Sequence, residues 1–318
     1  MTKDNEEKTY SEVEFLTVDG LKLRGRLYLG EANGPALVMA HGFNAVKEIV
    51  IPWAAEVFQK NGISVLLFDP RNYGESEGMP RQEVDPEKQI EDYFDAVTFL
   101  RQQPGIDPEA IGLWGVSTSG ATAIGAACFD KRVRLIISVC PLIEATFREE
   151  MVPDVMAQII REREALVAAR TAGQQSPQPT LVPMINQVGV SPMGFNAIHG
   201  KNFYEEMPWF KETAPNFRPH TTTLTYYKML RWHPLSNIRC LSPTPIQMLI
   251  PGKDDVCPTQ EQLDFFEALP GPKRMEYYED RNHHGLLLGS AFEGVMEAQV
   301  RFVQDVLAGK FALKSGSQ

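Results

Sequence analysis

Hydrophobic and polar residues alternate in two neighbouring segments near the N-terminus, 12–18 and 21–29, which are separated by Asp19 and Gly20. Alternation with a period of two is typical of a strand with one buried face, and Asp-Gly is a strong turn signal. The pattern therefore predicts an antiparallel hairpin at the start of the fold.

Beyond this hairpin the apolar runs are unbroken, as expected for parallel strands that are covered on both faces. Strands are predicted at 36–42, 63–70, from 111 into Ser117, 134–141, 245–252 and 273–280, and helices at 46–62, 86–105, 118–128, 259–269 and 292–309. Strand–helix–strand repetition implies a parallel sheet with right-handed crossovers. The sequence thus predicts an α/β fold with an eight-stranded, mostly parallel sheet and helices on both faces.

Residues 142–244 break this repetition between the sixth and seventh strands. The segment 149–173 has the pattern of one long helix or a bent pair, 174–183 that of a loop, and 221–234 that of a short amphipathic helix. A block of this length is too long for a simple connection. We therefore predict a helical lid at 142–244 inserted into a core formed by 1–141 and 245–318.

Composition narrows the classes of protein that the chain can belong to. Of its residues 43% are hydrophobic, which supports a large core without a metal or disulfide, and the formal net charge is −10. The negative charge argues against nucleic acid or an anionic membrane as the main partner. No apolar run approaches the roughly 18 residues of a membrane span, and the charged N-terminus lacks a signal-peptide core. We expect a soluble cytoplasmic protein.

The four cysteines have no CxxC spacing, so no zinc motif is predicted, and we expect neither a metal nor a cofactor. Cys128 and Cys140 lie in apolar stretches, where a reduced core thiol is the simplest interpretation.

The segment 112–120, GLWGVSTSG, resembles the G-x-S-x-G strand-to-helix turn of hydrolases, except that the last glycine arrives one position late. Such a turn holds the serine in a strained conformation, so the residues two before and two after it must be small, as Gly115 and Ser119 are. Ser117 ends the apolar strand and is the predicted nucleophile. The alternatives are Ser119 as nucleophile, or two ordinary hydroxyls at the start of a small-residue helix.

Two doublets after the last strands offer an acid and a base. The order Ser, Asp, His along the chain is that of the α/β-hydrolase fold, and the carboxyl ends of parallel strands meet at one edge of the sheet. The spacing G-x-x-D-x-x-P favours Asp255 over Asp254, and the usual place of the histidine favours His284 over His283. The imidazole would take the serine proton, and the carboxylate would fix its tautomer.

The oxyanion of an acyl-transfer reaction needs fixed N–H donors. In this fold they come from the residue after the serine, here Thr118, and from the loop after the third strand, where Phe43 is the expected donor. His41 in the same loop is a candidate substrate contact, and its alternative interpretation is a packed histidine in a tight turn.

With these residues, the chain resembles the fungal polyketide transferase and thiohydrolase family of α/β-hydrolases from about residue 12 to 308. The resemblance is carried by HGFNAVKE, FDPRNYGESEG, GVSTSG, GKDD and HHGLLLGSAFE, and more closely by SPTPIQML and the Phe292-Glu293 pair. The run D-x-R-x-x-G-x-S-x-G is common to many α/β-hydrolases and indicates only the fold.

The resemblance implies an activity and partners. Members take a polyketide acyl chain from a synthase-bound thioester onto a serine and pass it to water or to an alcohol. Carried over, Ser117 accepts the acyl group, Asp255 is the acid and His284 the base. The implied partners are a small-molecule or carrier-protein-bound acyl substrate and a polyketide synthase. The oligomeric state stays open, with a homodimer among the options.

Aromatic residues of the predicted lid are candidates for binding an acyl chain, and we single out Trp209, Tyr226, Tyr227 and Trp232. They would line an apolar tunnel, or else form the core of the lid itself. Tyr226 and Tyr227 are adjacent on a helix and point in different directions, so at most one of them needs to face the site.

Three functions remain open from the sequence. The first is serine-dependent transfer or hydrolysis of a polyketide-type acyl chain from a thioester or ester. The second is a general carboxylesterase or lactone hydrolase with the same triad. The third is a hydrolase fold without hydrolytic activity that binds a polyketide-like ligand or guides its cyclisation. The sequence names neither the acyl chain nor its acceptor.

Overall fold

The structure is a computed structural model, and it describes residues 8–144, 152–183 and 212–311. Its centre is an eight-stranded sheet in the order β1-β2-β4-β3-β5-β6-β9-β10. The strands are β1 (Ser11–Leu16), β2 (Lys22–Tyr28), β3 (Gly34–Ala40), β4 (Ser64–Asp69), β5 (Ile106–Val116), β6 (Ile136–Val139), β9 (Ile246–Pro251) and β10 (Lys273–Tyr278). β1 and β2 are antiparallel, as is the pair β2 and β4, and all other pairs are parallel. The predicted α/β-hydrolase sheet is confirmed.

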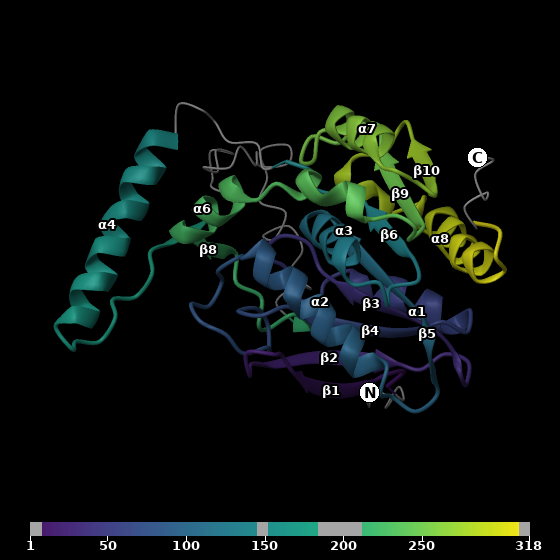
Figure 1. The fold of residues 1–318 in the computed structure, drawn as a ribbon, viewed down its shortest axis with the longest axis horizontal. Helices are drawn as coiled ribbons and strands as arrows, with labels where there is room; N and C mark the ends of the chain where they lie inside the picture. The colour runs from purple at the N-terminus through teal and green to yellow at the C-terminus, as the bar shows by residue number, and fades with distance from the viewer. Residues whose placement is uncertain (1–7, 145–151, 184–211, 312–318) are drawn as a thin grey trace, which may run out of the picture.

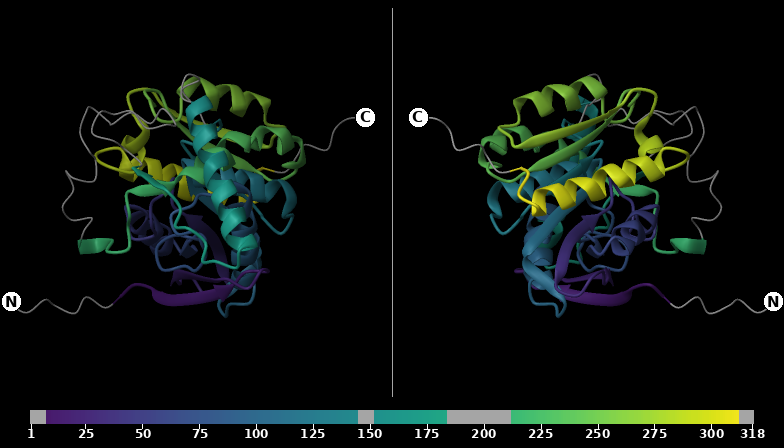
Figure 2. Two further views of the ribbon diagram at one scale, coloured as in Figure 1. Left: turned by 90° about the vertical axis from the view of Figure 1, so that its left-hand side faces the viewer. Right: turned by 90° about the vertical axis from the view of Figure 1, so that its right-hand side faces the viewer.

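Helices cover both faces of this sheet (Figures 1 and 2). One face packs against α2 (Pro86–Leu100), α3 (Thr118–Phe129) and α7 (Thr259–Ala268). The other packs against α1 (Ile51–Lys60) and α8 (Phe292–Leu307). The strands β3, β4, β6 and β9 lie between these two layers, and their side chains are almost all buried, which is why their sequences are continuously apolar.

The segment between β6 and β9 has its own elements. They are α4 (Val152–Thr171), β7 (Leu181–Pro183), β8 (His220–Thr222), α6 (Thr223–Arg231) and the 3₁₀-helix η3 (Pro234–Cys240). The helices expected at 149–173 and 221–234 are present as α4 and α6. The expected loop at 174–183 ends in β7, which pairs with β8 in a two-stranded antiparallel sheet. Trp209 lies outside the described residues.

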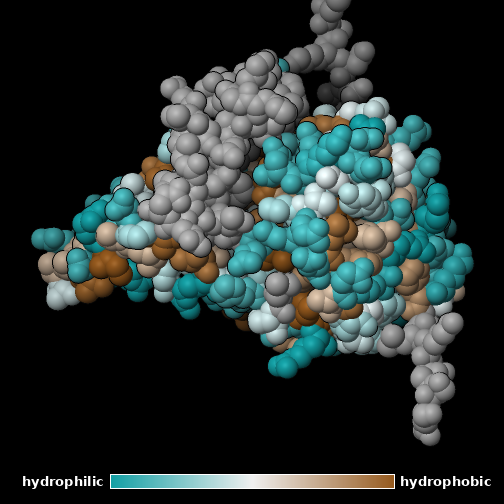
Figure 3. Space-filling model, turned by 90° about the horizontal axis from the view of Figure 1, so that it is seen from above, coloured by the Kyte–Doolittle hydropathy of each residue, from teal (hydrophilic) through white to brown (hydrophobic). Residues whose placement is uncertain are grey.

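The two helices of this segment differ in how they meet the core. α4 projects from the body of the molecule (Figures 1 and 3), and only Ile159 on it is buried. α6, in contrast, is fastened to the loop before α2, because Lys228 Nζ lies 2.6 Å from a carboxylate oxygen of both Glu83 and Asp85. In the same place the Val84 amide donates to Thr225 Oγ1 at 3.0 Å. No helix among the described residues has the length and apolar character to cross a bilayer.

Candidate active site

The backbone at Ser117 makes a sharp turn between β5 and α3. Its φ of 57° and ψ of −122° lie in a region that non-glycine residues rarely adopt. The turn is held from both sides, because the Ser117 amide donates to Val139 O and the Leu142 amide donates to Ser117 O. A strained serine between a strand and a helix is the geometry of the nucleophile elbow.

The small residues around the elbow are required sterically. A Cβ on Gly115 would lie 2.2 Å from the backbone oxygen of Ser119, and one on Gly120 would lie 2.9 Å from Ser138 Oγ. The Ser119 hydroxyl is already engaged, since it accepts from the Val116 amide at 2.8 Å and lies 2.8 Å from Ala40 O, to which it donates. This arrangement favours Ser117 over Ser119 as the reactive hydroxyl.

Asp254 and His283 form a buried pair at the same edge of the sheet. Both carboxylate oxygens of Asp254 lie 3.0 Å from His283 Nδ1. Asp254 Oδ1 also accepts from the amides of Val256 and Cys257, and Oδ2 accepts from Gln262 Nε2. This set of donors stabilises an ionised carboxylate. Burial alone would lower the pKa of His283, but the neighbouring Cys140 and Cys257 and the hydrogen bond to Asp254 raise it above its usual range.

The expected acid and base were Asp255 and His284, but the structure pairs the other member of each doublet, Asp254 with His283. The Asp255 side chain is exposed, since the turn that directs Asp254 inward directs its neighbour to solvent. His284 lies beside His283, with ring centroids 5.1 Å apart at 84°. Burial, and then the neighbouring His283, lower the pKa of His284 to about 4. His284 is therefore a neutral neighbour of the pair.

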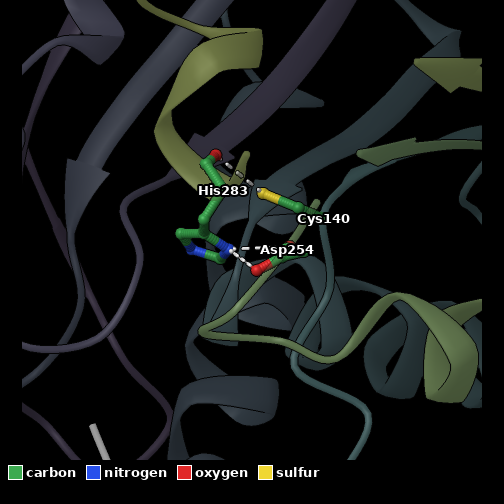
Figure 4. Close-up of side chains that lie close together, drawn as sticks. All are labelled: Cys140, Asp254 and His283. Atoms are coloured by element: carbon green, nitrogen blue, oxygen red, sulfur yellow. Dashed lines mark hydrogen bonds and ion pairs between the residues drawn. The ribbon is translucent and has the colours of Figure 1, made fainter. Parts of the chain in front are cut away.

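Cys140 completes a small buried cluster with these two residues (Figure 4). Its thiol donates to the backbone oxygen of His283 at 3.6 Å, and one ligand atom of each of Cys140, Asp254 and His283 lies within 4.8 Å of the others. Sulfur, oxygen and nitrogen at such spacing can hold zinc. Here, however, the Asp254 oxygens already accept three donors from outside the cluster as well as His283 Nδ1, so a charge-stabilised Asp–His pair is the simpler interpretation.

A second thiol, that of Cys257, lies against Ser117. Ser117 Oγ is 3.7 Å from Cys257 Sγ, and this is the hydrogen-bonding contact that its hydroxyl makes among the described residues. Burial raises the pKa of Cys257 to about 11, although the neighbouring His283 opposes that shift. The thiol is thus neutral and lies close to both Ser117 and His283. Among the described residues Ser117 Oγ thus bonds to Cys257 and not to His283, and catalytic hydrogen bonds often form only once substrate is bound.

The loop after β3 lies against the elbow on its other side. A Cβ on Gly42 would be 3.2 Å from the Ser117 Cβ, so the loop that continues into Phe43 passes against Ser117. Thr118 is the first residue of α3, and amides in the first turn of a helix have no partner within that helix. The expected oxyanion donors therefore belong to the two segments that flank Ser117.

A buried ion-pair network anchors this loop. Lys47 is fully buried, and its Nζ lies 2.8 Å from Asp69 Oδ2, 2.8 Å from Glu48 Oε1 and 2.6 Å from Glu75 Oε2. Burial alone would lower the pKa of Lys47, but Asp69 and Glu48 raise it above its usual range. The Lys47 amide also donates to Asp69 Oδ1 at 2.8 Å, so the loop is tied to the end of β4.

His41 belongs to the interior of this loop. It is 4% exposed, its Nδ1 lies 2.8 Å from Gly42 O, and its Nε2 lies 3.7 Å from Asp69 Oδ1. Burial lowers the pKa of His41. The structure thus favours a packed histidine over the expected substrate contact.

An apolar cluster connects the nucleophile region with α6. Its buried members are Tyr73, Val84, Ala121, Leu142, Tyr226, Met229, Trp232 and Cys257. Tyr226 and Trp232 therefore pack toward the site and do not form a separate core within the inserted segment. Tyr227 points elsewhere, since its ring lies under Arg231 at 5.1 Å and its hydroxyl accepts from the same guanidinium. The two adjacent tyrosines thus point in different directions, as their positions on a helix predict.

Sequence reasoning gave no role to Cys257 and treated Cys140 as a core thiol. Both are free and buried next to the Asp254–His283 pair. A cysteine in an apolar run has no sequence signal that separates a core position from a site position. For Asp254 the sequence does hold a signal, because aspartate often accepts the backbone amides two and three residues later in a local turn. Asp254 does so here with the amides of Val256 and Cys257.

Known proteins resemble this chain over most of its length. The family model described as Serine aminopeptidase, S33 matches residues 32–288. The chain is 37% identical to polyketide transferase claH of Penicillium crustosum, covering 94% of this chain and 98% of that one. It is also 37% identical to a thiohydrolase of Eupenicillium brefeldianum, covering 92% and 93%. The crystal structure of the α/β-hydrolase GrgF from Penicillium sp. sh18 superposes with a TM-score of 0.83 at 35% identity, covering 94% and 99%.

Proposed function

We propose that this chain, which belongs to the α/β-hydrolase family described as Serine aminopeptidase, S33, is an enzyme that moves an acyl chain through a covalent bond to Ser117. The observation that carries the proposal is the strained Ser117, whose Oγ lies 3.7 Å from the Cys257 thiol, next to the buried Asp254–His283 pair. A positioned hydroxyl, imidazole and carboxylate are the parts that acyl transfer needs.

In the proposed first step, Ser117 Oγ attacks the carbonyl carbon of a thioester or ester. His283 takes the hydroxyl proton through Nε2, because Asp254 holds Nδ1 in its protonated form. The negative charge on the carbonyl oxygen is stabilised by the amides of Thr118 and Phe43. Collapse of this intermediate expels the thiol or alcohol, which receives the proton from His283, and leaves an ester on Ser117.

In the second step, water or an alcohol attacks that ester with His283 again as the base. The curated relatives are named polyketide transferase, acyltransferase and thiohydrolase, which supports a polyketide-type acyl chain as the substrate of this chain as well. The apolar cluster that includes Tyr226, Met229 and Trp232 supports an apolar acyl chain beside Ser117. Such a substrate reaches the site free or bound to a carrier protein of a polyketide synthase.

Labelling with a fluorophosphonate followed by peptide mass spectrometry tests the nucleophile. We expect one adduct, on Ser117, and none on the Ser117→Ala protein. The matched control is Ser119→Ala, which removes a hydroxyl two residues away and should still be labelled on Ser117. A label on Ser119, or an undiminished label on Ser117→Ala, would contradict the mechanism.

The substrate class is tested separately with purified protein. We expect higher kcat/KM for N-acetylcysteamine thioesters of long acyl chains than for p-nitrophenyl acetate. Equal or better turnover of the acetate ester would instead identify a general carboxylesterase with the same catalytic residues. Tight binding of a polyketide that survives Ser117→Ala, with no turnover of any ester, would indicate a protein that only binds its ligand.

A further inference from the structure

Cys257 lies closer to the nucleophile than its place in the sequence suggests. Its side chain is 1% exposed, and its Sγ is 3.7 Å from Ser117 Oγ. Its backbone is fixed on both sides, because its amide donates to Asp254 Oδ1 at 2.9 Å and its carbonyl accepts from Gln262 Nε2. The loop that holds the acid thus also fixes the position of this sulfur.

The distance has a direct consequence for an acyl group on Ser117. The carbonyl carbon would be bonded to Oγ, and its first substituent would be only two bonds from Oγ. Non-bonded atoms reach optimal contact at about 3.5–4.0 Å. A sulfur 3.7 Å from Oγ is therefore in van der Waals contact with whatever the acyl group carries on that side.

The surroundings of the sulfur indicate which part of the substrate lies there. Cys257 shares the apolar cluster with Tyr226, Met229 and Trp232 of the α6 region. The oxyanion, in contrast, would be directed to the polar amides at Thr118 and Phe43. Cys257 thus lies where this apolar cluster meets the Asp254–His283 pair. We infer that the acyl chain leaves the carbonyl carbon on the side of the cluster.

We propose that Cys257 is a specificity-determining residue, whose sulfur limits the substituents accepted on the acyl carbon next to the reacting carbonyl. The inference rests on the proposed function, because it places an acyl group on Ser117. A straight acyl chain presents two hydrogens at this carbon, whereas an α-methyl-branched polyketide chain presents a methyl group. The thiol therefore favours the unbranched chain.

The chemistry of the Cys257 thiol supports a steric role rather than a nucleophilic one. Since burial raises the pKa of Cys257 to about 11, almost none of it is thiolate at neutral pH, and the neutral thiol is a weak nucleophile. Cys257 is therefore not expected to carry the acyl group itself.

A test uses fluorophosphonates that carry either an n-propyl or an isopropyl group on phosphorus. In this reaction the Ser117 Oγ–P bond forms, the P–F bond breaks, fluoride leaves, and the hydroxyl proton passes to His283. The measured quantity is the ratio of the second-order labelling rates, isopropyl over n-propyl, followed by intact mass. A methyl-sized change in an apolar pocket alters rates by roughly 10- to 200-fold. We expect Cys257→Ala to raise the ratio at least tenfold.

Three further variants separate the effect of side-chain volume at position 257 from the chemistry of sulfur and from a general loss of packing at the site. Cys257→Ser replaces the sulfur by a smaller oxygen on a shorter bond, so it should raise the ratio, though less than Cys257→Ala does. Cys257→Val is larger and should lower it. Cys140→Ala removes an equal sulfur that contacts the backbone of His283, and it should not change the ratio. The Val and Ser variants retain the test if Cys257→Ala does not fold.

The outcomes distinguish this inference from the proposed function. An unchanged ratio in folded Cys257→Ala and Cys257→Val, with Ser117 still labelled, would overturn the inference alone. A ratio that rises in Cys257→Ala and Cys257→Ser and rises equally in the larger Cys257→Val would also overturn it, because the loss of sulfur and not volume would then be responsible. Failure of Ser117 labelling in the wild-type protein would overturn both.

Discussion

Replacing Asp254 by asparagine tests which carboxylate supports the base. Asp254 Oδ1 accepts the amides of Val256 and Cys257, so the asparagine oxygen would keep that place. The new NH₂ group would then occupy the Oδ2 position, where it meets His283 Nδ1 and Gln262 Nε2. Two donors cannot face each other, and His283 would lose its proton at Nδ1 and keep one at Nε2. In that tautomer it cannot accept the proton of Ser117.

The size of the effect follows from this tautomer change. Removing the carboxylate of a Ser–His–Asp triad while its geometry is retained lowers kcat about ten-thousand-fold. At 1.36 kcal/mol for each tenfold change, this equals about 5 kcal/mol of lost transition-state stabilisation. The matched control is Asp255→Asn, which makes the same chemical change at the neighbouring, exposed residue. Because that side chain is exposed, we expect its kcat to stay within about threefold of the wild-type value.

The assay is the steady-state hydrolysis of one thioester by both variants, with thermal unfolding to confirm that each is folded. The expected result is a loss in kcat for Asp254→Asn with little change in KM. A large loss in Asp255→Asn together with near-normal activity in Asp254→Asn would refute the reasoning. It would show that the loop rearranges so that Asp255 meets the base.

Two further predictions concern stability. Lys47→Met leaves the buried Asp69 carboxylate without its cation, so we expect the free energy of unfolding, measured by urea denaturation, to fall by about 3–5 kcal/mol. The control is Lys253→Met, which should have little effect because the ion pair of Lys253 with Asp280 is exposed. For His284, burial lowers the pKa from 6.5 to about 4, so the folded state binds fewer protons than the unfolded state between these values. Stability is then present above pH 6.5 and falls as the pH drops towards 4, and His284→Gln should weaken that dependence in thermal unfolding; an equal pH slope in both proteins would contradict the assignment.

The sheet was predictable because strands that are buried on both faces have continuously apolar sequences. The runs at 36–42, 63–70 and 245–252 are apolar throughout, and the structure places them as β3, β4 and β9. The hairpin followed from its alternation and from Asp19-Gly20, where Gly20 adopts a φ of 85°. The inserted segment was less predictable, since a three-residue strand such as β7 has no periodicity to detect.

The sequence predicted which loops carry the acid and the histidine, but not which residue of each doublet points into the site. Asp254 and Asp255 are one position apart, and only the turn between them decides which side chain points inward. The same is true of the histidine doublet. There, Asn282 caps the short helix η4 (His283–Leu286) by accepting the Gly285 amide at 3.0 Å, and this cap sets the orientation of the first histidine. A spacing motif counts positions along the chain, whereas these hydrogen bonds set which way each side chain points.

The two departures from the usual motif are explained by the same local contacts. Ser119 occupies the position of the missing glycine, and its hydroxyl forms hydrogen bonds with Val116 N and Ala40 O. The glycine one position later, Gly120, is required because a Cβ there would clash with the Ser138 side chain. His283 takes the glycine position of the histidine motif and is itself the residue that meets Asp254. A glycine is thus required at position 120, and the histidine that meets Asp254 lies one residue earlier than the motif predicts. Neither departure removes a group that acyl transfer needs, so an active enzyme is the expectation that the geometry favours.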